Sequence, residues 1–216
     1  MVDIYADCAE LSQIWKWSAD PRISGITTNP SLMKKAGIAN YREFAKQVLE
    51  RVKDKPVSLE VLSDDWQEME EQALILASMA PNVYVKIPIT NTQGDSSKSL
   101  IKKLANLNLN VTAIMTSRQL SHIAPVMRSH HIASVFVGRI MDTGAMPHRP
   151  VPWKTKLLWA STREVFNIEE ATRAGYDIIT MTPDLLGKLA LRGKDLTEYS
   201  LETVRQFHED GKGISF

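Results

Sequence analysis

The sequence predicts one α/β domain over residues 1–216, built as a closed (β/α)8 (TIM) barrel. Eight short segments alternate apolar and polar side chains with the period of a strand. Most of them are separated by segments whose apolar residues recur at helical spacing. Strands joined by helices pair in parallel, and eight such units in 216 residues match the usual size of a closed barrel.

A doubly wound open sheet is the structural alternative. A nucleotide-binding version of that fold carries a glycine-rich phosphate loop after its first strand. The segment that follows Asp7 contains no such loop. The closed barrel is therefore the preferred prediction.

The expected strands follow from period-two alternation and from the turn residues that bound it. In chain order they are residues 1–7, 23–31 (a short strand closing on a turn), 57–61, 83–90, 107–114, 134–139, 156–161 and 177–181.

The expected helices begin at capping residues or proline and end at glycine, proline or polar turns. Pro30 and Ser31 are suited to start one helix, Asp64 or Asp65 can cap the helix that runs to about Met79, and Ser117 can cap another. The remaining helices are expected near residues 11–20, 41–52, 100–104, 168–174, 183–191 and 196–209.

One unit of the barrel is irregular. From Met141 to Thr155 the chain carries Pro147, Pro150 and Pro152 and shows no helical period. The sixth helix of the barrel is therefore expected to be shortened or replaced by a proline-rich loop.

The composition narrows the possible partners. Lys+Arg 26 and Asp+Glu 25 leave a net charge of +1, which does not favour a nucleic-acid or acidic-membrane surface. No segment resembles a signal peptide or reaches the roughly 18 apolar residues of a membrane span. Cys8 alone cannot form an intramolecular disulfide and is expected to be a small buried residue. A cytoplasmic protein with a small-molecule partner is predicted.

Most histidines and tryptophans are expected to have structural roles and not to form a functional site. The five histidines show no spacing with carboxylates that indicates a metal site, and a solvated surface position is expected for them. His148 and Arg149, in the irregular loop, could instead contact a bound substrate. The five tryptophans are expected to pack in the core, although Trp159 shares parity with Ser161 and is a candidate for the pocket wall.

Val83–Thr90 is the most informative stretch. Val83, Val85, Ile87 and Ile89 alternate with polar positions, so Lys86 is expected on the face opposite the helices. Desolvation favours the neutral amine, which is a nucleophile towards carbonyls. A lysine that reaches solvent from the strand end is the alternative.

Other polar residues share the inner face with Lys86. By parity, the barrel interior is expected to collect Asp7, Glu60, Lys86, Asn110, Thr112, Ser134, Phe136 and Ser161, together with Asn29 if it closes the second strand. Barrel interiors are normally filled with branched apolar side chains, and buried polar groups are costly unless they are paired. The pattern therefore favours a functional site.

Arg139 and Arg163 lie at or just past the ends of the sixth and seventh strands. Two guanidinium groups near a hydroxyl would form a clamp for phosphate oxygens. Pairing of each arginine with a surface carboxylate such as Glu164 is the alternative.

Five motifs together resemble the short transaldolases and the related fructose 6-phosphate aldolases. They are Gly25–Ser31 (Gly-Ile-Thr-Thr-Asn-Pro-Ser), Val85–Pro88 (Val-Lys-Ile-Pro), Asn110–Thr112 (Asn-Val-Thr), Phe136–Arg139 (Phe-Val-Gly-Arg) and Ala160–Arg163 (Ala-Ser-Thr-Arg). They occur in order along nearly the whole chain. The resemblance implies a (β/α)8 barrel, no metal or organic cofactor, a Schiff base on Lys86, and a homo-oligomer that could be a pentamer or decamer.

The resemblance also implies a role for each matching residue. Asp7 would move the proton of the substrate hydroxyl, and Glu60 and Thr112 would hold a proton-shuttling water. Thr27, Asn29, Asn110 and Ser134 would hold donor hydroxyls. Arg139, Ser161 and Arg163 would bind the sugar phosphate.

Two positions separate the subfamilies. Aldolase-type members carry a glutamine and a tyrosine where this chain has Glu60 and Phe136. The resemblance therefore favours a transaldolase that transfers a dihydroxyacetone unit from a ketose phosphate to an aldose. An aldolase releasing free dihydroxyacetone, and a sugar-phosphate-binding barrel without catalysis, remain alternatives.

Overall fold

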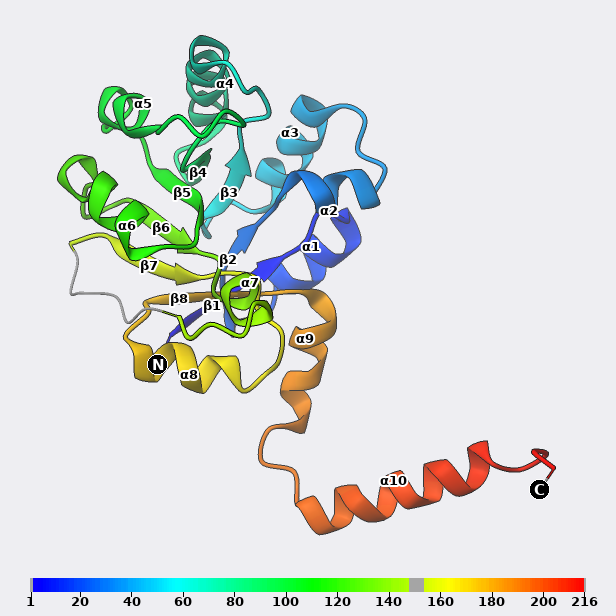
Figure 1. Cartoon of the computed structure of the whole chain (residues 1–216). Helices are drawn as coiled ribbons and strands as arrows, with labels where there is room; N and C mark the ends of the chain where they lie inside the picture. The colour runs from blue at the N-terminus through cyan, green and yellow to red at the C-terminus, as the bar shows by residue number, and fades with distance from the viewer. Residues whose placement is uncertain (1, 148–153, 216) are drawn as a thin grey trace. The chain divides into compact units, whose positions relative to one another are not determined.

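The computed structural model describes residues 2–147 and 154–215 and shows a closed barrel of eight parallel strands in chain order (Figure 1). The predicted (β/α)8 fold is confirmed. The strands are β1 (Asp3–Asp7), β2 (Ile23–Thr27), β3 (Val57–Glu60), β4 (Val83–Pro88), β5 (Leu109–Ile114), β6 (Ile132–Val135), β7 (Lys156–Trp159) and β8 (Ile178–Met181).

The chain divides into two compact units, Met1–Leu186 and Gly187–Phe216. In the first unit helices surround the barrel (Figure 1). The helices, including the 3-10 helices η1 and η2, are α1 (Leu11–Ser18), α2 (Pro30–Lys35), α3 (Tyr41–Arg51), α4 (Trp66–Met79), α5 (Lys98–Lys103), α6 (Ser117–Ile123), η1 (Ala124–Val126), α7 (Val137–Asp142), α8 (Asn167–Ala174), α9 (Pro183–Gly187), η2 (Lys188–Leu191) and α10 (Leu196–Asp210). No helix among the described residues is long and apolar enough to cross a membrane.

Short side chains fix where several helices begin. Asp65 accepts hydrogen bonds from the backbone N–H groups of Gln67 and Glu68 at the start of α4, as one of the two predicted caps. Thr116, and not the predicted Ser117, caps α6 through a reciprocal pair of hydrogen bonds with Gln119.

The parallel register places the polar residues of neighbouring strands at the same height along the barrel axis. Glu60 lies opposite Lys86, and Lys86 lies opposite Asn110. On the far side of the barrel, Asp7 lies opposite Thr27. Because side chains alternate along a strand, these residues all point into the barrel near the carboxyl ends of their strands.

Part of the barrel interior is filled with apolar and aromatic side chains. Tyr5, Ile132, Leu158, Ala160 and Ile178 form a buried cluster, with Tyr84 and Phe136 packed against it. Gly25 makes room for Tyr5 of this cluster, since a Cβ atom on Gly25 would lie 2.5 Å from the Tyr5 ring. This cluster shares Phe136, Leu158 and Ala160 with the wall of the cavity described below.

The sixth unit differs in detail from the sequence expectation. The predicted strand from Ser134 to Arg139 ends at Val135, and α7 begins at Val137. Arg139 therefore projects from a helix and not from a strand. The expectation of a shortened sixth helix is confirmed by the six residues of α7. Residues 148–153, which include His148, Arg149, Pro150 and Pro152, lie outside the described residues.

Trp159 does not line the pocket, contrary to the possibility raised by its parity with Ser161. It faces the outer layer, where its ring meets Tyr176 edge to face at 5.3 Å between centroids. Leu158 takes the inward position on β7. Cys8 is buried as predicted.

His131 is fully buried, with 0% of its surface exposed, so its predicted surface position is wrong. Its Nδ1 accepts a hydrogen bond from the backbone N–H of Arg128 at 3.1 Å, and its Nε2 lies 3.1 Å from the carbonyl of Ala105, to which it donates as the neutral tautomer. Burial lowers the pKa of His131 from 6.5 to about 4.

We expect His131 to make the fold sensitive to acid. The unfolded chain binds a proton at this residue below pH 6.5, whereas the folded chain does so only below about pH 4. The free energy of unfolding should therefore fall as the pH drops between these values, by up to about 1.4 kcal/mol per pH unit. Urea unfolding at several pH values measures this slope. His131→Gln should flatten it, whereas a His122→Gln control with the same slope as His131→Gln would contradict the assignment.

Candidate active site

A cavity of about 260 Å³ opens at the carboxyl ends of the barrel strands. All predicted site residues except Arg163 line it: Asp7, Thr27, Asn29, Glu60, Lys86, Asn110, Thr112, Ser134, Phe136, Arg139 and Ser161. A larger hollow of about 690 Å³ is lined by residues of α4 and α5, including Glu71 and the paired Glu70 and Lys103. Among the described residues, the barrel cavity brings together the part-buried Asp7 and Glu60 and the buried Lys86.

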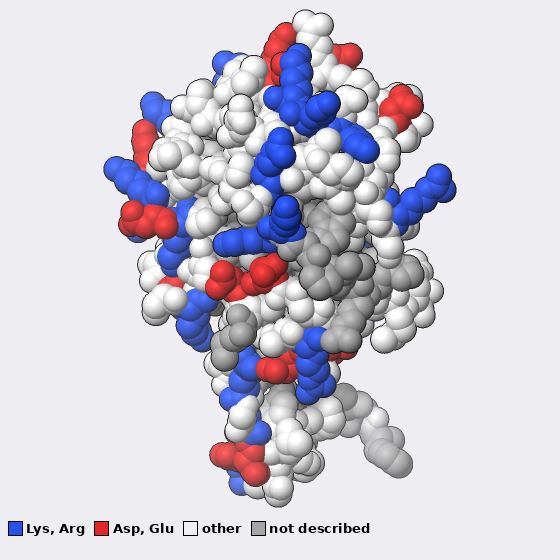
Figure 2. All heavy atoms as spheres, turned by 90° about the vertical axis from the view of Figure 1, so that its left-hand side faces the viewer, with Lys and Arg blue, Asp and Glu red and all other residues white. Residues whose placement is uncertain are grey.

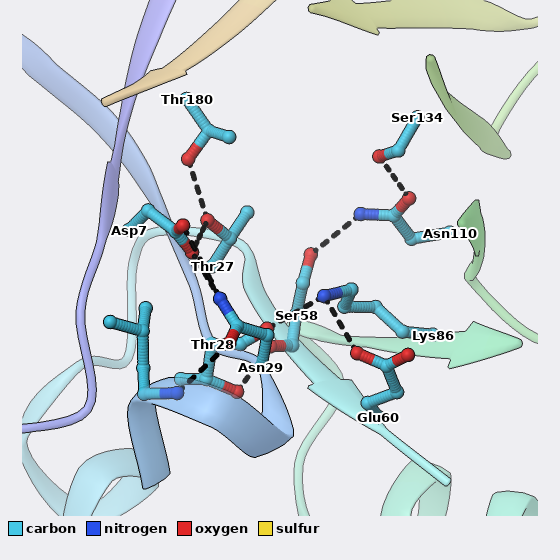
Figure 3. A network of polar contacts seen from close by, with 11 residues as sticks. Asp7, Thr27, Thr28, Asn29, Ser58, Glu60, Lys86, Asn110, Ser134 and Thr180 are labelled. Atoms are coloured by element: carbon cyan, nitrogen blue, oxygen red, sulfur yellow. Dashed lines mark hydrogen bonds and ion pairs between the residues drawn. The ribbon is translucent and has the colours of Figure 1, made fainter. Parts of the chain in front are cut away.

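Lys86 projects from β4 into the cavity wall and is only 6% exposed. Its Nζ lies 2.9 Å from Oε2 of Glu60 and donates a hydrogen bond to the carbonyl of Thr28 at 2.7 Å (Figure 3). The ion pair is largely desolvated, so removal of one partner would leave the other charge unpaired. The amine is fixed in position and accessible only from the cavity.

Asp7 ends β1 beside the same cavity. Oδ1 accepts a hydrogen bond from the Thr27 hydroxyl at 2.8 Å, and the amide nitrogen of Asn29 lies 3.4 Å from Oδ2. Burial raises the pKa of the Asp7 carboxyl, although the Lys86 charge and these two hydrogen bonds oppose the rise. A carboxyl group whose pKa is raised by burial is suited to take up and return a proton.

Thr180 joins this corner of the site and was missed in the sequence. Its hydroxyl lies 2.6 Å from that of Thr27, and it must be the donor because Thr27 donates to Asp7. Thr180 shares the inner face of β8 with Ile178, and this parity was the signal that could have revealed it.

Asn29 links the site to the helix that follows. Its Oδ1 accepts a hydrogen bond from the backbone N–H of Leu32 at 2.9 Å and so caps α2, with Pro30 in the first helical turn. Because the oxygen is committed to the cap, the amide nitrogen faces Asp7.

A second polar chain crosses the opposite wall. Ser134 donates a hydrogen bond to Oδ1 of Asn110 at 2.6 Å, and the Asn110 amide donates to the hydroxyl of Ser58 at 3.1 Å (Figure 3). Ser58 is the second missed residue, although it shares the inner face of β3 with Glu60. These bonds fix the orientation of the Asn110 amide towards the cavity.

Two non-glycine residues of the described chain have positive φ, and both line the cavity. Ala113 and Ser161 each have φ of 61°. Ala113 lies where the register between β5 and β6 shifts, and Ser161 follows the end of β7. Side chains are uncommon in this conformation, and such strain concentrates at functional sites.

The predicted two-arginine clamp is not assembled. Arg139 lines the cavity, with its guanidinium carbon 5.2 Å from the centre of the Phe136 ring. Arg163 instead pairs with Asp142 of α7 through two hydrogen bonds, of which Nε to Oδ1 measures 3.0 Å. For Arg163, the structure agrees with the alternative prediction that it pairs with a surface carboxylate. The partner is Asp142 and not Glu164. Among the described lining residues, Lys86 is paired with Glu60, and Arg139 supplies a second positive charge at the cavity.

Comparisons with known proteins agree with the barrel fold and identify a family. The family model described as Transaldolase/Fructose-6-phosphate aldolase matches residues 4–216. A protein named probable transaldolase from Mesorhizobium japonicum is 32% identical over 86% of this chain and 87% of its own length. Another of that name from Bartonella henselae is 30% identical over 96% of this chain and 95% of its own.

Solved structures show the same fold at low identity. A dihydrodipicolinate synthase from Rhodopseudomonas palustris has a TM-score of 0.55 and 11% identity, covering 84% of this chain and 70% of its own. A type I 3-dehydroquinate dehydratase from Clostridium difficile has a TM-score of 0.54 and 7% identity, covering 84% of each chain. Given the family match over nearly its whole length, the chain belongs to the transaldolase/fructose-6-phosphate aldolase family.

Proposed function

We propose that the protein is a transaldolase that transfers a dihydroxyacetone unit from a ketose phosphate to an aldose phosphate through a Schiff base on Lys86. Family membership supports a transaldolase- or aldolase-type activity. The observation that carries the finer proposal is the amine of Lys86 itself, desolvated in the cavity wall, 2.9 Å from Glu60.

The first half of the reaction joins the donor ketone to Lys86. The neutral amine attacks the carbonyl carbon, and loss of water from the carbinolamine gives an iminium ion. Glu60 is the nearest carboxylate to the amine and can take its proton. Thr112, opposite Pro88 in the register, lines the same wall and would share a water with Glu60.

The second half breaks and remakes a carbon–carbon bond. Asp7 would remove the proton from the donor hydroxyl beside the bond, and the bonding electrons would flow into the iminium to give an enamine and a free aldose. The enamine then attacks the aldehyde of the acceptor, whose oxygen takes the proton back from Asp7. Hydrolysis of the new iminium regenerates Lys86.

Phe136 supports transfer over release of free dihydroxyacetone. It lines the cavity beside Arg139 and carries no hydroxyl that could protonate the enamine carbon. The enamine would therefore persist until an aldehyde arrives. Arg139 and Ser161 would bind the phosphate group of the sugar.

Borohydride trapping tests the proposal directly. The protein is incubated with fructose 6-phosphate and sodium borohydride, and the modified peptide is mapped by mass spectrometry. We expect a reduced three-carbon or sugar adduct on Lys86. An unmodified Lys86 would favour a sugar-phosphate-binding barrel without catalysis.

Turnover with and without an acceptor separates transferase from lyase. With fructose 6-phosphate alone, a transaldolase should stop after about one equivalent of glyceraldehyde 3-phosphate per site. Addition of a four-carbon aldose phosphate should restore continuous turnover. Steady release of free dihydroxyacetone without an acceptor would identify an aldolase.

We also propose that the protein is a homo-oligomer, with the pentamer and decamer as the expected states. Helix α10 supports this proposal because its apolar side chains, including Leu196, Val204 and Phe207, are exposed, and such side chains mark protein–protein interfaces. The exposed fraction of Phe207 is 68%. Light scattering should give several times the mass of one chain, and the double change Val204→Glu and Phe207→Glu should lower it. A wild-type protein with the mass of a single chain would contradict the proposal.

A further inference from the structure

Helix α7 approaches the segment after β7 so closely that one position has no room for a side chain. Gly138 is buried, and its backbone N–H donates to the carbonyl of Ala160 at 3.3 Å. A Cβ atom on Gly138 would lie 1.6 Å from the carbonyl oxygen of Ser161 and 2.7 Å from its carbonyl carbon. Since the obstacle is backbone, no change of rotamer relieves the clash.

The two segments that meet at this contact, α7 and the residues after β7, carry neighbouring parts of the cavity wall. Arg139 follows Gly138 directly and lines the cavity. Ser161 lines it from the other side of the contact, with φ of 61°. A strained backbone of this kind persists only where its surroundings hold it, and the surface of α7 at Gly138 is one of those surroundings.

We propose that Gly138 is a positioning residue for the anion-binding end of the cavity. Its missing side chain lets α7 press on Ser161, and this contact sets the distance between the Ser161 hydroxyl and the Arg139 guanidinium. The inference rests on the proposed function, which makes these two groups the ligands of the sugar phosphate. Gly138 itself touches no substrate.

The other end of α7 is also held to this segment. Asp142 forms two hydrogen bonds with Arg163, which lies two residues after Ser161. Half-exposed ion pairs contribute little to overall stability, but this one restrains the helix that carries Arg139. Arg163 would thus act on the phosphate site through the position of α7.

Gly138→Ala is the central test, and Gly187→Ala is its matched control. Gly187 is helical and exposed, with φ of −59° and no atom within 4 Å of an added Cβ. Calorimetric titration measures binding of fructose 6-phosphate. We expect Gly138→Ala to weaken it about 10- to 100-fold, as for the loss of hydrogen bonds to a charged group, and Gly187→Ala to leave it unchanged.

A phosphate-free probe separates positioning from general damage. Borohydride trapping of dihydroxyacetone on Lys86 needs no phosphate contact, so its rate should be the same in Gly138→Ala and in the wild type. Equal losses in both measurements, or unchanged binding of fructose 6-phosphate, would overturn the inference. If the wild type shows neither binding nor trapping, the proposed function has failed instead.

Asp142→Asn provides a second test if Gly138→Ala does not fold. Asp142 is half-exposed, so this variant should fold normally. Loosening α7 should weaken fructose 6-phosphate binding about two- to fivefold, on the scale of one exposed ion pair. If Arg163 were a direct phosphate ligand, freeing it would tighten binding, and either tighter or unchanged binding would overturn the inference.

Discussion

Replacing Lys86 by methionine should abolish carbon–carbon bond transfer and borohydride labelling. Methionine fills a similar volume but has no nucleophile, so no iminium can form to accept electrons from the breaking bond. Loss of a catalytic nucleophile lowers kcat by factors on the order of 10⁴ to 10⁶. The measurement is the rate of aldose transfer from fructose 6-phosphate, with Lys102→Met on the exposed side of α5 as the control.

The same change should also destabilise the fold, which must be separated from the catalytic effect. Glu60 would be left as a nearly buried carboxylate without its partner, at a cost of about 3–5 kcal/mol. The double variant Lys86→Met with Glu60→Gln removes that charge and should recover much of the stability without activity. A Lys86→Met enzyme with the wild-type rate would end the Schiff-base proposal.

Replacing Asp7 by asparagine should slow cleavage of the donor about 10²- to 10⁴-fold while Lys86 still forms an imine. Asparagine can still accept the Thr27 hydrogen bond at Oδ1, but it cannot take a proton. Trapping of dihydroxyacetone by borohydride should therefore proceed, while release of glyceraldehyde 3-phosphate from fructose 6-phosphate nearly stops. Equal loss of trapping and cleavage would show that Asp7 acts earlier, in imine formation.

The pH profile gives a second signature of Asp7. Its base form is needed, so activity should fall as the pH drops through the carboxyl pKa, and burial raises that pKa above the ordinary 3.8. The acidic limb of kcat/KM should thus lie at higher pH than for an exposed aspartate. Asp7→Asn should remove this limb, and Asp3→Asn, at the exposed start of β1, should retain it.

Much of the site could be predicted because alternation along each strand shows which side chains point inward. Parallel pairing then places the inward residues of neighbouring strands at the same height along the barrel axis. Lys86, Glu60 and Asn110 needed only alternation and an in-register sheet to meet. Thr180 and Ser58 obeyed the same rule and were overlooked. The chemical roles of these residues remain predictions.

Other features depended on information that alternation does not carry. Ser161 reaches the cavity through a positive φ beyond the end of β7, so counting parity from it placed Trp159 on the wrong face. The partner of Arg163 is set by α7, which begins at Val137, within a segment that was expected to be strand up to Arg139. His131 is buried because backbone groups at Arg128 and Ala105 satisfy both ring nitrogens, which no local pattern reveals.

The cap that Asn29 provides for α2 limits how this position can evolve. Alanine at position 29 would forfeit about 1 kcal/mol of helix stability along with the contact to Asp7. Aspartate would keep the cap but place a second negative charge beside Asp7, and serine is too short to serve both neighbours. Position 29 is thus constrained both by the α2 cap and by the contact with Asp7, so changes in what the cavity binds should proceed through other parts of its wall.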